Sequence, residues 1–144
     1  MSHCELCQTD GGEVLLRTPQ WRIVLVDDPA YPGFCRVIWN EHVREMTDLP
    51  ESDRTECLRV VLMVEALVRE VMQPEKINLA SLGNVVPHLH WHIIPRYADD
   101  AHFPAPIWAE AKRTVAPDTL AARRARLPQL RATLIQRAQK LVRA

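Results

Sequence analysis

The sequence carries no excess of charge of either sign and no long hydrophobic run. Lysine and arginine together number 18, as do aspartate and glutamate, so the formal net charge is zero. This balance argues against nucleic-acid binding through bulk charge, although it leaves a local basic patch open. The longest apolar run, residues 60–64, is far too short to span a membrane. We therefore expect neither a membrane protein nor a protein that works mainly on nucleic acid.

An export signal is also missing, and cysteine is scarce. The first residues, MSHCELC, contain no basic start followed by an apolar stretch, so we expect a cytoplasmic protein. The four cysteines, Cys4, Cys7, Cys35 and Cys57, are then not expected to form disulfides. The C-x-x-C pair of Cys4 and Cys7 is typical of a metal half-site or a redox pair. No βαβ pattern flanks it, which favours the metal.

The order of elements predicts one α+β domain over residues 1–144. Runs rich in Val, Ile and Leu predict strands at 13–17, 21–26, 34–39, 76–80 and 88–94. Apolar residues at three- and four-residue spacing predict a helix over 51–72, which Pro74 ends. A helical region covers about 117–144 and is interrupted or restarted at Pro128. We expect an antiparallel sheet, a central helix and a C-terminal helix, with the motif-bearing core at about 13–96.

Half of the six histidines stand at alternating positions in one predicted strand. The period of a strand places His88, His90 and His92 on one face and the apolar residues between them on the other. A pattern H-x-H is half of many metal sites, but such sites usually recruit a nearby carboxylate, and residues 82–96 contain none. The second interpretation is a neutral imidazole that attacks phosphorus between two donors. The missing carboxylate favours this interpretation.

The residues around these histidines resemble the histidine-triad family. The string HLHWHII at 88–94 matches the family signature, and GNVVP at 83–87 resembles its lead-in. The resemblance covers about residues 21–96 and implies a nucleotidyl hydrolase or transferase that releases a nucleoside monophosphate, with AMP expected. The implied substrates are diadenosine polyphosphates or adenosine phosphoramidates, and the implied assembly is a homodimer through the central helix and an edge strand. Other residues that fall where the family has equivalents are Pro32, Gly33, His42 and Asn78.

The resemblance also implies roles for the three histidines. His90 would attack the α-phosphorus and form a covalent nucleotidyl-histidine, which water then hydrolyses. His92 would contact the phosphate or orient the nucleophile, and His88 completes the catalytic triad. No cofactor is needed for this chemistry.

Four further residues are implied to bind the nucleotide. Asn84 stands where the family has a polar side chain for the phosphate or the leaving-group bridge, and Asn78 joins the same binding set. Asp27 or Asp28 would hold the ribose hydroxyls.

A structural zinc site is implied by Cys4, Cys7, His42 and His88. Four nitrogen and sulfur ligands leave no open position, so such a zinc would be structural and would take His88 away from the phosphate. Two alternatives remain at this point: a nucleotide-binding regulatory module with little turnover, and a metal-dependent hydrolase that uses all three triad histidines as ligands.

Overall fold

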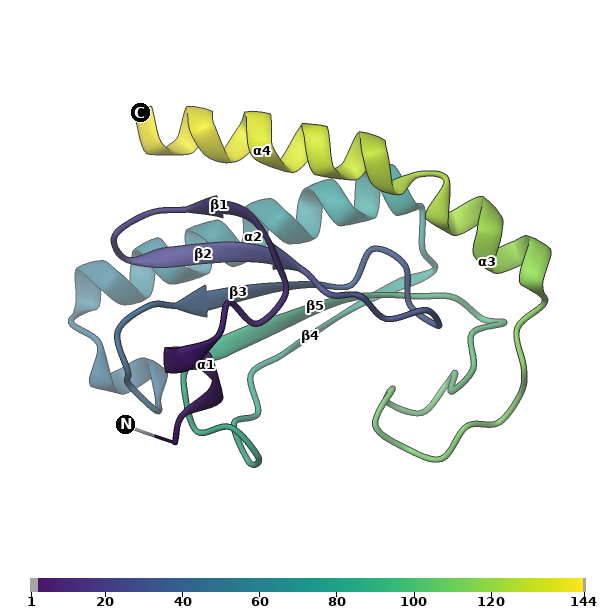
Figure 1. The fold of residues 1–144 in the computed structure, drawn as a ribbon, viewed down its shortest axis with the longest axis horizontal. Helices are drawn as coiled ribbons and strands as arrows, with labels where there is room; N and C mark the ends of the chain where they lie inside the picture. The colour runs from purple at the N-terminus through teal and green to yellow at the C-terminus, as the bar shows by residue number, and fades with distance from the viewer. Residues whose placement is uncertain (1–2, 144) are drawn as a thin grey trace.

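A computed structural model describes residues 3–143 as one antiparallel sheet with helices on its faces (Figure 1). The strand order is β1-β2-β3-β5-β4, and each neighbouring pair is antiparallel. This arrangement confirms the predicted α+β class. The strands are β1 (Glu13–Arg17), β2 (Trp21–Leu25), β3 (Cys35–Trp39), β4 (Lys76–Ala80) and β5 (His90–Arg96). The helices are α1 (Glu5–Gln8), α2 (Glu51–Met72), α3 (Pro117–Arg124) and α4 (Leu127–Arg143), with a 3-10 turn at Met46–Asp48.

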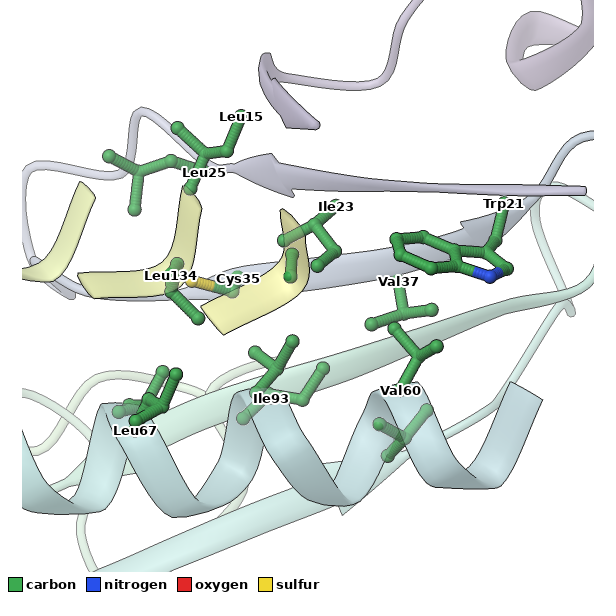
Figure 2. Packing of buried hydrophobic residues seen from close by; sticks show 14 of the residues in the cluster. Leu15, Trp21, Ile23, Leu25, Cys35, Val37, Val60, Leu67, Ile93 and Leu134 are labelled. Carbon is green, nitrogen blue, oxygen red and sulfur yellow. The ribbon is translucent and has the colours of Figure 1, made fainter. Parts of the chain in front are cut away.

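Helices α2 and α4 pack on the same face of the sheet and form the main core with it (Figure 2). In the core, Ile23 and Val37 of the sheet meet Val60 and Leu67 of α2 and Leu134 of α4, all of them buried. Each such aliphatic side chain contributes about 1.5–3 kcal/mol when it leaves water. The C-terminal helix therefore belongs to the core of its own domain and contacts α2 and β1.

The opposite face of the sheet carries the histidines and is only partly covered. Leu6 of α1 packs there against Val24 and Ile38. Trp91, which alternates with the histidines along β5, packs instead toward the main core, as the period of the strand predicted. The side of the sheet without the long helices is thus the one where a ligand can reach the histidines.

The predicted element boundaries are partly correct. Strands β1 and β4 and helix α2 have the predicted bounds. Helix α2 ends at Met72, and the next residue, Gln73, has a positive φ of 52° and stands before Pro74. Strand β5, however, begins at His90 and not at residue 88. The N–H of His88 donates to the carbonyl of Val86 in the same loop, which takes it out of the ladder. Within the described residues, no helix is both long and apolar enough to cross a membrane.

Candidate active site

His90 and His92 lie side by side on β5 and are both buried. Their ring centroids are 4.8 Å apart and nearly perpendicular. Across the sheet, His90 pairs with Ile38 and His92 with Arg36 of β3. The exposed fractions of His90 and His92 are 8% and 6%, so each ring is held by its surroundings in one orientation.

A backbone hydrogen bond sets the tautomer of His90. Its Nδ1 lies 2.5 Å from the carbonyl oxygen of His88, which can only accept, so the ring proton sits on Nδ1. The other ring nitrogen, Nε2, then carries a free lone pair. Burial lowers the pKa of His90, and the charge of Arg36 lowers it further. The ring is therefore a neutral imidazole at neutral pH, as a nitrogen nucleophile must be.

His92 is a neutral hydrogen-bond donor beside that nucleophile. The Nε of Arg36 donates to Nδ1 of His92 over 3.4 Å, which leaves the proton of His92 on its Nε2. Burial, with the nearby His90 and Arg36, lowers the pKa of His92 to about 3. The rings of Phe34 and Trp108 stand edge-on to His92, with centroids 5.7 Å and 5.1 Å away. Since Trp108 is half exposed, this indole forms an aromatic wall at the rim of the site.

Two clefts include His90 in their lining. The Gly11 cleft has a volume of about 520 Å³ and includes Gly11, Gly12, Arg36 and Val86 in its lining. The Ser81 cleft has a volume of about 300 Å³ and is lined by the β4–β5 loop and the segment around Arg44. A substrate bound at His90 would thus have room in both clefts.

Cys4, Cys7, His42 and His88 form a cluster of metal-ligand atoms next to the triad. The Nδ1 of His88 lies 3.4 Å from the Sγ of Cys4 and 3.2 Å from the Nδ1 of His42. The Sγ of Cys7 lies 3.5 Å from the Nδ1 of His88 and 3.4 Å from the Nδ1 of His42. Around a zinc ion with Zn–S of about 2.3 Å and Zn–N of about 2.0–2.1 Å, tetrahedral ligand atoms lie about 3.3–3.8 Å apart. The donor set and its spacing therefore fit a closed tetrahedral zinc site.

The surroundings of His88 prepare its Nδ1 for a metal. The Nε2 of His88 lies 2.6 Å from the carbonyl oxygen of Trp39 and donates to it, so Nδ1 is unprotonated. Burial lowers the pKa of His88, which keeps the ring neutral. Helix α1 holds Cys7, and Cys4 caps its N-terminal end. Of the three triad histidines, only His88 belongs to the cluster of metal-ligand atoms. The described residues thus give no support to a metal bound by all three.

The structure disperses the four predicted nucleotide-binding residues. Asn84 is exposed in the β4–β5 loop, between residues that line the two clefts. Asp28 accepts a hydrogen bond from the N–H of Ala30 inside the β2–β3 loop, and its neighbour Asp27 is exposed. The Oδ1 of Asn78 accepts from Nη1 of Arg96 over 2.8 Å, so this amide serves a structural network. None of the four lines either cleft.

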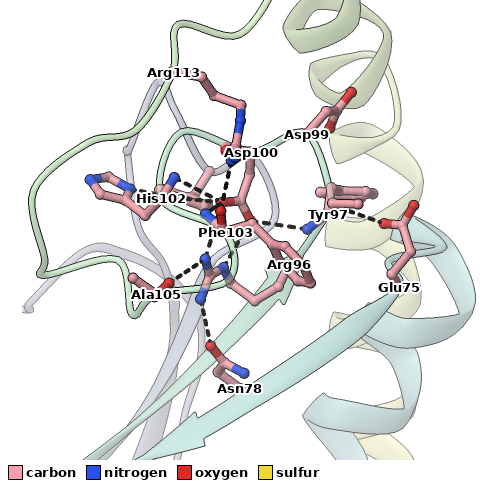
Figure 3. A network of polar contacts seen from close by, with 12 residues as sticks. Glu75, Asn78, Arg96, Tyr97, Asp99, Asp100, His102, Phe103, Ala105 and Arg113 are labelled. Carbon is pink, nitrogen blue, oxygen red and sulfur yellow. Dashed lines mark hydrogen bonds and ion pairs between the residues drawn. The ribbon is translucent and has the colours of Figure 1, made fainter.

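That network holds the loop after β5 (Figure 3). Arg96 and Asp100 are almost fully buried and form an ion pair over 2.8 Å. Asp100 also accepts from the N–H groups of Tyr97, His102 and Phe103. Arg113 closes the loop by donating to the carbonyls of Asp100 and Phe103.

Sequence reasoning missed two side chains that contact His92, those of Arg36 and Trp108. Nothing in the local sequence marked Trp108, because the loop that carries it is folded by the buried Arg96–Asp100 pair and by Arg113. Arg36 was read only as part of a strand, although its place on β3 opposite β5 could have been found once the strands were paired.

The chain is thus a small α+β domain with neighbouring histidines on an open strand face. The model of the HIT domain matches residues 10–99, and the chain belongs to this family. It is 30% identical over 95 residues to a bis(5'-nucleosyl)-tetraphosphatase [asymmetrical] of Schizosaccharomyces pombe, a match that covers 62% of this chain. It is 27% identical over 100 residues to an AP-4-A phosphorylase of Mycobacterium tuberculosis, a match that covers 65% of this chain. The matched regions span about half the length of these relatives, 52% and 51%.

Solved structures share the fold. A histidine triad protein from Marinobacter aquaeolei superimposes with a TM-score of 0.68 at 26% identity, over 87% of this chain and 92% of that one. A histidine triad protein from Bradyrhizobium japonicum gives a TM-score of 0.65 at 26% identity, over 81% and 91% of the two chains.

Proposed function

We propose that this protein is a nucleotidyl hydrolase or transferase that cleaves dinucleoside polyphosphates or adenosine phosphoramidates through a nucleotidyl-histidine at His90. The observation that carries the proposal is the hydrogen bond from Nδ1 of His90 to the carbonyl of His88, which leaves the lone pair of Nε2 free on a residue that lines both clefts. The two curated relatives are named for activity on dinucleoside tetraphosphates, which supports the substrate class.

The first step forms a covalent bond at Nε2 of His90. The lone pair of Nε2 attacks the α-phosphorus, and an N–P bond replaces the P–O or P–N bond to the leaving group. The electron pair of the broken bond departs with the bridging atom. Negative charge grows on the phosphoryl oxygens meanwhile, and the Nε2–H of His92 is the donor placed to meet it.

The second step regenerates the enzyme. Water attacks the phosphorus of the nucleotidyl-histidine, the N–P electron pair returns to Nε2, and a nucleoside monophosphate is released with a proton to solvent. Another acceptor in place of water would make the reaction a transfer. The triad thus needs no cofactor for its chemistry.

We further propose that Cys4, Cys7, His42 and His88 hold one structural zinc ion. The zinc would tie α1 to the loop before β5, and so fix the carbonyl of His88 that orients His90. The chain's own contribution is the neutral His88, whose Nε2–H is already bonded to Trp39. None of the four cysteines forms a disulfide, which is consistent with a reducing compartment and with the cytoplasm as the location.

A homodimer through α2 and β4 is the proposed assembly. β4 is an edge strand, and Leu79 on it is 40% exposed. Leu58 and Leu62 of α2 are 41% and 58% exposed, and Leu82 follows β4 at 55%. An exposed apolar face beside an unpaired strand edge is typical of a protein interface.

A turnover assay with a matched histidine variant tests the proposal. Release of AMP from diadenosine tetraphosphate and from adenosine phosphoramidate would be measured for wild type, His90→Ala and His3→Ala. His3 is exposed at the N-terminus and serves as the control. We expect His90→Ala to lose at least about 10³-fold in kcat and His3→Ala to stay within about twofold. Equal activity of His90→Ala and wild type would remove His90 as nucleophile. AMP binding without turnover by wild type would favour the regulatory module.

A further inference from the structure

Arg36 places a cation inside the site, and the carboxylates of Glu5 and Asp28 act on its charge only through space. Its Nε donates to Nδ1 of His92 over 3.4 Å, and its Nη1 donates to the carbonyl of Gly11 over 3.0 Å. Among the described residues it forms no ion pair, and its Nη2 has no hydrogen bond. One edge of the guanidinium is therefore fixed by the protein, and the other is free for an acceptor from outside.

Gly11 makes the fixed geometry possible. Its φ of +79° lies in the left-handed region, and a Cβ there would stand 2.7 Å from Cδ1 of Ile38 and 2.8 Å from Cδ2 of Leu6. Only glycine lets the chain approach the sheet closely enough to present its carbonyl to Arg36. The guanidinium is thus held in place before any ligand arrives.

Two other arginines of the sheet differ from Arg36, because their donors are already used. Arg22 donates to the carbonyls of Leu6 and Asp10 and to the side chain of Asn40. Arg96 donates to both oxygens of Asp100, to Asn78 and to a loop carbonyl. Arg22 and Arg96 therefore stabilise the fold, whereas the Nη2 of Arg36 can still donate a hydrogen bond to a ligand.

The position of Arg36 relates this charge to the reaction. Arg36 lines the Gly11 cleft together with His90, and it is the one lysine or arginine in that lining. Two carboxylates also line the cleft, Glu5 and Asp10, and Asp10 is paired with Arg17 over 2.6 Å. A guanidinium stays charged at any physiological pH, so Arg36 is a permanent positive charge in the cleft that His90 lines.

We propose that Arg36 binds the phosphate chain of the leaving group and so determines specificity for substrates whose leaving group is a polyanion. This inference rests on the proposed function and chooses between its two substrate classes. When a dinucleoside polyphosphate is cleaved, the P–O electron pair stays on the bridging oxygen, and a nucleoside polyphosphate departs with the added charge. When a phosphoramidate is cleaved, the departing nitrogen takes a proton from solvent and leaves as an amine. Only the first leaving group gains from a fixed guanidinium.

The test compares leaving groups on one AMP moiety. Values of kcat/KM for diadenosine tetraphosphate and adenosine phosphoramidate would be measured for wild type, Arg36→Leu, Arg36→Gln and Arg36→Lys. The matched control is Arg131→Leu. It removes the same charge from α4, where Arg131 forms an exposed ion pair with Glu13 of β1. The contact of Arg36 with His92 affects both substrates alike, so the ratio of the two losses is the readout. We expect Arg36→Leu and Arg36→Gln to lose about 10- to 100-fold more on the tetraphosphate than on the phosphoramidate. Arg36→Lys should fall in between, because lysine keeps the positive charge but lacks the planar pair of N–H donors of a guanidinium.

A binding measurement distinguishes a failure of the proposed role of Arg36 from a failure of the proposed function. In a His90→Ala background, where no turnover interferes, the Kd of diadenosine tetraphosphate and of AMP would be measured with and without Arg36→Gln. We expect about a tenfold or larger rise in Kd for the tetraphosphate and little change for AMP. Equal losses for both ligands, or equal losses in kcat/KM for both substrates, would overturn the role in leaving-group recognition while leaving the proposed function intact. If wild type turns over neither substrate, the proposed function fails, and the binding comparison still decides the role of Arg36.

Discussion

At position 90 the ring proton is held on Nδ1 by the carbonyl of His88, and the chemistry of the site follows from that placement. The side chain of His88 faces Cys4 and Cys7, while its backbone orients His90. One residue therefore links the proposed zinc cluster to the nucleophile. Beside His90, the neutral His92 is a hydrogen-bond donor. Arg36, which donates to His92, is a fixed cation.

The Asp100 carboxylate provides a pH-dependent part of the stability. Burial alone would raise the pKa of Asp100, but hydrogen bonds from Arg96 and three backbone N–H groups hold it well below the usual value of about 3.9. A carboxyl whose folded pKa is depressed stabilises fully above its unfolded pKa, and the contribution is lost as the pH falls through the folded pKa.

We expect Asp100→Asn to lower the free energy of unfolding by about 3 kcal/mol at pH 7, because Arg96 is left buried without its charged partner. Urea unfolding at several pH values checks this. The difference from wild type should be constant from pH 8 to about pH 5 and should shrink below about pH 4. A difference that is absent at pH 7, or that grows toward acid, would contradict the role of the pair.

Among the elements, the sheet and α2 could be predicted from the sequence, and α1 could not. Runs rich in Val, Ile and Leu predicted β1 and β4, and apolar periodicity predicted α2, all at their observed bounds. Helix α1 has four residues, too few for a periodic signal, and it is held by Leu6 against Val24 and Ile38 of distant strands. The position of α1, and hence of the two cysteines, depends on tertiary contacts that no local pattern encodes.

The candidate site, like the fold, could be predicted from the sequence only in part. Alternation along one strand was enough to place His90 and His92 together, since it needs only local geometry. Arg36 and Trp108 reach the same point from β3 and from a loop 16 positions after His92, so strand pairing and the Arg96–Asp100 pair decide their place. The predicted roles of Asn84, Asp27, Asp28 and Asn78 stay predictions, since these residues lie outside the lining of both clefts.

Removal of one cysteine tests the zinc that anchors α1. We expect wild type to bind about one zinc per chain and Cys7→Ser to bind less than about a tenth of that, with a lower Tm, because structural zinc contributes directly to folding. Zinc content would be measured by plasma mass spectrometry on dialysed protein. Cys57→Ala is the control, since Cys57 is buried in the main core and should keep the full zinc content. Wild type without zinc after refolding in its presence would refute the site.

At the scale of the whole molecule, the two faces of the sheet have separate tasks. One face is covered by α2 and α4 and supplies the core (Figure 1). The other face carries His90 and the two clefts that it lines. The outer surface of α2 and the β4 edge remain exposed and apolar, so the proposed dimer forms away from the substrate side of the sheet.

A charge placed on that outer surface tests the dimer. We expect wild type to have the mass of two chains in light scattering after gel filtration, and Leu62→Glu to have the mass of one, because a buried unpaired carboxylate costs several kcal/mol. Val142→Glu is the matched control, since Val142 is 54% exposed on α4, against 58% for Leu62 on α2. A monomeric wild type, or dissociation by Val142→Glu alone, would contradict an interface at α2.

The central claim is covalent catalysis at His90, and intact mass spectrometry tests it most directly. Wild type and His90→Ala would be mixed rapidly with diadenosine tetraphosphate or adenosine phosphoramidate and quenched in alkali, which protects a phosphohistidine. A transient mass gain of one AMP in wild type, absent in His90→Ala, is the predicted result. If AMP forms without a detectable adduct, the activity of His90→Ala decides: retained turnover would contradict the claim.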